Sequence, residues 1–120
     1  MILADTSVWV AHFRVGNPRL VGLLEEGHVV CHPFVIGELA CGTLRNRVAV
    51  LGHLQRLRDV PVATHAEALS LVERHRLAGT GLGWMDVHLL ASTLLGHARL
   101  WSLDRPLQAV AERLGCGATP

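Results

Sequence analysis

The sequence predicts an α/β fold built on a short parallel sheet. Short apolar runs of strand length alternate with longer segments in which apolar residues recur at helical spacing, a pattern typical of parallel strands joined by helices. The chain has 120 residues, 50% of them hydrophobic and 18% charged, which excludes intrinsic disorder. We therefore expect one domain over residues 1–120, with its own core and an unusually high helical share.

The expected strands and helices follow one another along the whole chain. Strands are expected at residues 2–4, 28–31, 60–62 and 99–103, and helices at residues 8–14, 18–26, 33–44, 47–58, 64–76, 84–96 and 105–114. The tail from residue 115 onward is short, and we expect it to fray.

Residues with strong local preferences mark the ends of the N-terminal elements. The first apolar run stops at Asp5 and Thr6, both of which suit a helix cap. Gly27 closes the second helix, because glycine readily ends helices. Pro33 opens the third helix in the first turn, where its missing N–H is tolerated.

The C-terminal elements are marked in the same way. Pro61 restricts the third strand to an edge or an end of the sheet. Thr64 and Glu67 have the spacing of a capping box, which predicts the start of the next helix. Three glycines then break the chain before the most apolar helix: Gly79, Gly81 and Gly83.

Charge and cysteine content exclude several classes of protein. All eleven basic residues are Arg, and P-loop kinases, Schiff-base enzymes and phospho-acceptor receivers all depend on a Lys. The formal net charge is +1, so attraction to nucleic acid must be local. Three scattered cysteines fit a reducing compartment, and neither a signal peptide nor a membrane span is expected. A cytoplasmic protein without membrane contact is the expectation.

Four of the ten acidic residues lie inside apolar sequence, where isolated carboxylates are costly. Asp5 and Asp104 follow apolar runs and therefore fall at the carboxyl ends of two expected strands, the edge where open parallel sheets bind ligands. Glu38 and Asp86 lie on the apolar sides of two expected helices, so their side chains are expected to point toward the core or a cleft.

Convergence of these four carboxylates predicts a metal site. Clustered carboxylates raise one another's pKa, and a divalent cation relieves the repulsion. Mg²⁺ or Mn²⁺ prefers oxygen ligands of this kind and, once bound, can activate water for attack on a phosphodiester. The competing interpretation, that each acid is a helix cap or an Arg partner, is less able to explain four cases together.

The same residues resemble a known family, the PIN-domain proteins, and more narrowly the VapC-type toxins of bacterial toxin–antitoxin pairs. The resemblance rests on four segments that cover almost the whole chain in order: residues 3–8 (LADTSV), 36–39 (IGEL), 85–91 (MDVHLLA) and 100–105 (LWSLDR). It implies a three-layer α/β/α sandwich, Mg²⁺- or Mn²⁺-dependent endoribonuclease activity, and a homodimer inhibited by a cognate antitoxin protein.

The resemblance also assigns site residues. It implies that Asp5, Glu38, Asp86 and Asp104 are the catalytic, metal-binding acids, and that the hydroxyl of Thr6 belongs to the site. From the residues alone, Thr6 could bond a ligating carboxylate or simply cap a helix, and Ser7 could help to order the site.

Features that could bind substrate or partner are weaker. Arg45, Arg47 and Arg105 are the candidates for RNA phosphates, since they lie close to the acids in sequence. Trp84 could stack a base at the mouth of the cleft, although burial in the core is the more common outcome for such a residue. An exposed apolar groove for an antitoxin helix is expected from a set of large side chains: Phe13, Leu20, Leu23, Leu24 and Phe34.

Other functions remain open at this point. A non-catalytic RNA- or protein-binding module could keep an inactive acidic site, and a structure-specific DNA nuclease would need the same acids. A receiver-like Mg²⁺ domain is disfavoured because Thr6 stands where a second acid is required and no Lys is present.

Overall fold

The fold is organised around a three-stranded parallel sheet. The computed structural model describes residues 1–120, with strand order β2-β1-β3. The strands are β1 (Ile2–Ala4), β2 (Val29–Val30) and β3 (Arg99–Trp101). The helices are α1 (Thr6–Val15), α2 (Pro18–Glu25), α3 (Pro33–Cys41), α4 (Arg47–Arg56), α5 (His65–His75), α6 (Trp84–Leu95) and α7 (Arg105–Arg113). The α/β class with a parallel sheet is confirmed.

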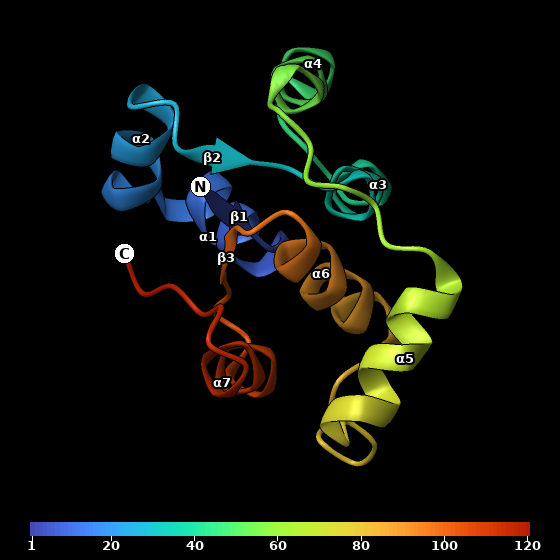
Figure 1. Ribbon diagram of the computed structural model, residues 1–120. Helices are drawn as coiled ribbons and strands as arrows, with labels where there is room; N and C mark the ends of the chain where they lie inside the picture. The colour runs from blue at the N-terminus through green and yellow to red at the C-terminus, as the bar shows by residue number, and fades with distance from the viewer.

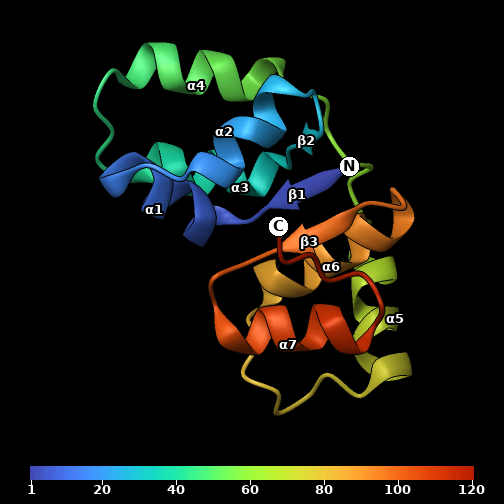
Figure 2. The ribbon, with the colours of Figure 1, turned by 90° about the vertical axis from the view of Figure 1, so that its left-hand side faces the viewer.

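The helices form two layers with the sheet between them. Figures 1 and 2 show α1 to α4 on one side of the sheet and α5 to α7 on the other. One cluster of 28 buried apolar residues joins the layers, with Leu3, Leu90, Leu100 and Leu107 completely inaccessible. This is the three-layer sandwich that the family resemblance implies. None of the helices combines the length and apolar character needed to cross a membrane.

Both edges of the sheet are extended by single bridges, and here two predictions were wrong. The expected strand at residues 60–62 is reduced to one parallel bridge between Cys31 and Asp59, because Pro61 has no N–H with which to continue the ladder. The tail does not fray. Gly117 bridges Leu100, whose carbonyl accepts a 2.8 Å hydrogen bond from the N–H of Ala118.

This strand order places a crevice at the carboxyl end of the central strand. The chain leaves β1 toward β2 on one side, whereas β3 lies on the other side of β1. Helices that leave such a reversal point diverge to opposite faces, and open α/β sheets bind ligands there. The N–H of Asp5 donates to the carbonyl of Trp101 at 3.0 Å, so the ends of β1 and β3 lie side by side at this point.

Helix boundaries differ from prediction by a few residues, with local causes. Helix α1 begins at Thr6, two residues early, because Asp5 itself is the N-cap and accepts from the N–H of Val8. Helix α3 ends at Cys41 instead of residue 44, since Gly42 is extended (φ −91°, ψ −176°). The guanidinium of Arg47 donates to the carbonyls of Ala40 and Gly42 and so satisfies the exposed end of α3.

Candidate active site

Asp5 is the buried centre of the site. It follows β1 directly and is only 5% exposed. One carboxylate oxygen accepts from the hydroxyl of Ser7 at 2.5 Å and from the N–H of Val8 at 3.3 Å, while the other accepts from the hydroxyl of Ser102 at 2.5 Å. Three donors on an ionised carboxylate stabilise its charge and fix its orientation.

Ser102 belongs to the candidate site, although the sequence did not point to it. It is 4% exposed, and while its hydroxyl donates to Asp5 it also accepts from the N–H of Asp104 at 3.0 Å. Ser7 makes a parallel link, because its hydroxyl accepts from the N–H of Leu103 at 2.9 Å. The two serines therefore tie the end of β1 to the segment that follows β3. The signal that could have found Ser102 is a serine inside the apolar run 100–103, which directly precedes Asp104.

Glu38 joins the site through α3, which runs beside α1. The hydroxyl of Thr6 donates to a carboxylate oxygen of Glu38 at 2.8 Å, across 32 residues of sequence. Thr6 is thus bonded to a candidate ligand, and Asp5 alone takes the capping position of α1. The sequence left open whether Glu38 points toward the core or toward a cleft. The side chain is exposed, so it does not enter the core.

Asp86 shows that the four acids share one electrostatic environment. It lies in the first turn of α6, half-buried, and accepts from the N–H of Gly83 at 3.0 Å. Burial raises the pKa of its carboxyl, and the negative charges of Asp104, Asp5 and Glu38 raise that pKa further, against the lowering effect of the Gly83 hydrogen bond. The fold therefore brings the other three sequence-predicted acids within electrostatic reach of Asp86.

Asp104 completes the group from the segment after β3. It is exposed and sits at the N-cap position of α7 without making a side-chain cap. The competing interpretation of these acids as Arg partners fails, since the sole ion pair in the structure joins Glu26 to His28. Capping is real for Asp5 and Asp86, but it leaves the shared negative charge uncompensated.

The donor set fits a hard divalent cation in chemistry. No group of three His, Cys, Asp or Glu side chains is arranged to hold a metal ion as the structure stands. The hydrogen bonds give the reason: Asp5, Glu38 and Asp86 each point an oxygen at a donor of the chain itself. Carboxylates without cationic partners are nevertheless the ligands that Mg²⁺ and Mn²⁺ take, and the exposed members of the set have room to rotate.

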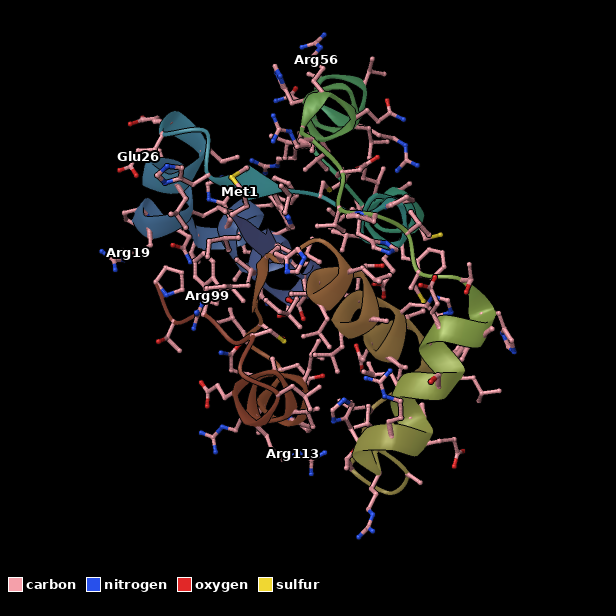
Figure 3. All side chains as sticks on the ribbon, viewed as in Figure 1. Met1, Arg19, Glu26, Arg56, Arg99 and Arg113 are labelled. Carbon is pink, nitrogen blue, oxygen red and sulfur yellow. The ribbon has the colours of Figure 1, made fainter.

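The predicted phosphate-binding arginines differ in how free they are. Arg47 has its guanidinium engaged at the end of α3, on the carbonyls of Ala40 and Gly42. Arg45 and Arg105 are exposed, and neither forms a side-chain hydrogen bond. Arginine side chains reach outward over much of the surface, as Arg19, Arg56 and Arg113 illustrate in Figure 3.

Trp84 is exposed, which overturns the expectation of burial. Its side chain is 41% exposed at the first position of α6. The ring meets His88 edge-on at 4.8 Å and lies 5.1 Å from His65, between centroids. His88, which the ring contacts, is itself buried and packs against Phe34 as well.

Of the five side chains expected to form an apolar groove, only Phe13 and Leu24 line one, and Leu23 is not among its residues. Leu20 is completely buried and Phe34 packs against His32 and His88, so neither belongs to it. A cleft of about 150 Å³ lies between α1, α2 and α4. Its lining comprises Trp9, Phe13, Leu24, Val50, His53, Leu54 and Leu57.

Comparison with known proteins decides the family. The family model described as PIN domain matches residues 2–113. The chain belongs to the PIN-domain family. It is 50% identical over 116 residues to Ribonuclease VapC32 of Mycobacterium tuberculosis, from strain CDC 1551 / Oshkosh and equally from strain H37Rv. The match covers 96% of this chain and 94% of the relative. The family predicted from the four acidic segments is thus confirmed, and the candidate acids of this PIN domain lie at its sheet's reversal point.

Proposed function

We propose that this PIN-domain chain is a metal-dependent endoribonuclease and the toxin of a toxin–antitoxin pair. The observation that carries the proposal is the group of four carboxylates at the reversal point of the sheet, none of which forms an ion pair. The 50% sequence identity to Ribonuclease VapC32 over 96% of this chain supports RNA as the substrate and a role as a toxin. We infer that residues 1–120 act as a single domain.

The chemistry assigns a separate task to each acid. A bound Mg²⁺ or Mn²⁺ would activate water and neutralise charge on the scissile phosphodiester. Asp5, fixed by three donors, is the rigid ligand, and Asp86 and Asp104 are ligands whose side chains can adjust. Glu38 is a further ligand or the base that orients water, and Thr6 positions its carboxylate. Ser7 and Ser102 hold Asp5 in place.

The apolar cleft between α1, α2 and α4 is the proposed site at which an antitoxin binds and inhibits the nuclease. An amphipathic helix of a cognate antitoxin suits this cleft, because it is lined almost entirely by carbon and opens on the same helix α1 that begins at the acids. We also propose that the active form is a homodimer, as the family resemblance implies. Three free cysteines and an RNA substrate support a cytoplasmic location.

Purified protein incubated with total cellular RNA tests the activity. Discrete fragments are expected with Mg²⁺ or Mn²⁺, and neither EDTA-treated protein nor the Asp5→Asn variant should produce them. Circular dichroism of Asp5→Asn must match the parent, so that lost cleavage reports the carboxylate. Full activity of Asp5→Asn would refute the assigned site. Tight RNA binding without cleavage under any metal would favour the binding module, and cleavage confined to structured DNA would favour the DNA nuclease.

A further inference from the structure

A second cavity lies beside α1, away from the carboxylates. It has a volume of about 820 Å³ and opens between the second half of α1 and the segment that joins α3 to α4. Its lining includes Val10, Phe13, Arg14, Leu44, Arg45 and Val50. Half of the lining is apolar, two residues are arginines, and none is acidic. This combination is suited to a ligand that carries both negative charge and a flat apolar group.

The two arginines have no carboxylate partner. Glu26 and His28 form the sole ion pair of the structure, so neither Arg14 nor Arg45 is neutralised. Nor do they serve the backbone, unlike Arg47 and Arg99, whose guanidinium groups donate to main-chain carbonyls. Two unpaired positive charges that line the same cavity repel each other, and an anion between them would remove the repulsion. Guanidinium groups bind phosphate oxygens with two donors each.

Phe13 supplies the flat apolar surface. Its ring packs on Trp9 at 5.9 Å between centroids, and the side chain remains 38% exposed. An aromatic ring held on one side and open on the other is a platform on which any base can stack.

Both walls of the cavity lead back to the acids. On α1, Thr6, Val10 and Phe13 follow one another on one face at helical spacing, and Arg14 lies beside Phe13. On the opposite wall, Glu38 precedes the segment that contains Arg45. The hydrogen bond between Thr6 and Glu38 joins the two walls at the catalytic end. Along α1 the distance from Thr6 to Arg14 is about 12 Å, a length that a few nucleotides of single-stranded RNA span. Figure 2 shows α1 and α3 running together toward the chain that rises to α4.

We propose that this cavity is a nucleotide subsite, in which Arg14 and Arg45 bind a backbone phosphate and Phe13 stacks the attached base of an RNA strand whose scissile bond lies at the carboxylates. The inference rests on the proposed ribonuclease function and adds the residues that position the substrate. It assigns Arg14 and Phe13 a role in substrate binding that the sequence did not indicate.

Salt-dependent RNA binding tests the subsite. In the Asp5→Asn background, which leaves RNA intact, the affinity for a short fluorescein-labelled single-stranded RNA is measured at several salt concentrations. Each phosphate that the protein neutralises contributes about 0.7 to the slope of log affinity against log salt. Because Arg14 and Arg45 share one phosphate, the double variant should lower the slope by about 0.7, and each single variant by part of that amount. Arg19→Gln, an exposed arginine of α2, is the matched control and should leave the slope unchanged.

The aromatic platform has its own readout. Phe13→Leu should weaken binding about tenfold at every salt concentration without changing the slope, whereas Phe13→Trp should retain affinity because it keeps the stacking surface. Thermal melting of each variant must match the parent, which is expected since all three side chains are exposed.

Two outcomes would overturn the subsite. One is an unchanged salt slope in the Arg14→Gln/Arg45→Gln variant. The other is normal RNA binding by the two arginine variants together with loss of antitoxin binding, which would assign the cavity to the protein partner; Phe13 is left out of this comparison because it also lines the cleft proposed for the antitoxin. Either result would leave metal-dependent cleavage by the parent protein intact. Failure of the ribonuclease function would instead appear as absence of cleavage by the parent protein, so the two failures are distinguishable.

Discussion

His32 makes the folded state sensitive to acid. It is completely buried at the N-terminus of α3, the helix that carries Glu38. Its Nδ1 accepts from the N–H of Phe34 at 3.0 Å and caps the helix, which assigns the proton to Nε2, 3.1 Å from the hydroxyl oxygen of Ser92. The bond from Phe34 requires a neutral ring, because a protonated Nδ1 can no longer accept. Burial lowers the pKa of His32 from 6.5 to about 4, and the neighbouring His88 lowers it in the same direction.

The shift sets both the sign and the size of the effect. Between pH 6.5 and about 4 the unfolded chain binds a proton at His32 and the folded chain does not, so the free energy of unfolding falls as the pH falls through this window. A displacement of this size corresponds to about 3 kcal/mol in total. The stabilisation is fully present above pH 6.5, and most of it is lost by pH 4.5.

Urea unfolding at pH 7 and pH 4.5 measures the effect, with His32→Asn as the matched variant. Asn does not titrate and is itself a good helix cap, so it preserves the start of α3. Carboxylates and the other histidines affect both proteins alike and cancel in the comparison. The parent should lose about 2–3 kcal/mol more than His32→Asn between the two pH values. Equal losses in the two proteins would show that His32 is protonated in the folded state and would refute the reasoning.

Two further predictions concern the site and the sheet edge. Ser102→Ala removes one of the three donors to the Asp5 carboxylate and should raise the Mg²⁺ concentration for half-maximal RNA cleavage about 10- to 100-fold. Ser70→Ala, on the exposed side of α5, is the control and should leave this concentration unchanged. An unchanged Mg²⁺ requirement in Ser102→Ala would mean that Ser102 is only structural. Gly117→Ala would place a Cβ 2.9 Å from a backbone nitrogen of α7 and should lower the free energy of unfolding by about 1–3 kcal/mol in thermal melts. Gly52→Ala lies in α4, where the space is open, and should raise the free energy of unfolding by about 0.5–1 kcal/mol. Equal melting temperatures of Gly117→Ala and the parent would contradict the ordered tail.

The sequence was most informative where local chemistry and fold agree. Apolar runs predicted β1, β2 and β3, and caps such as the Thr64 and Glu67 box predicted where helices begin. The four candidate acids stood out because each interrupts an apolar segment. Their convergence could be predicted too, since the carboxyl ends of parallel strands meet at one edge of the sheet.

The features that escaped prediction depend on partners distant in the sequence. Gly117 is ordered only because Leu100 offers an unpaired strand edge, and nothing in the tail itself signals this. The link from Ser102 to Asp5 spans 97 residues, and a lone serine has many possible roles. Trp84 was expected in the core because tryptophan is usually buried, but its ring lies partly exposed against His65 and His88, which could not be identified as its partners from the sequence alone.

The apolar surroundings of the acids predicted where they would meet, but not how differently they would be held. Asp5 is buried and bonded to three donors, because it lies at the end of the central strand with serines from two segments around it. Glu38 and Asp104 are exposed, because they lie at the rim of the crevice and Asp5 lies at its floor. In the proposed metal site, Asp5 would fix the position of the cation, and the exposed Glu38 and Asp104 would be the ligands free to adjust as substrate enters and leaves. The unequal burial of the four acids would then suit turnover better than four rigid ligands.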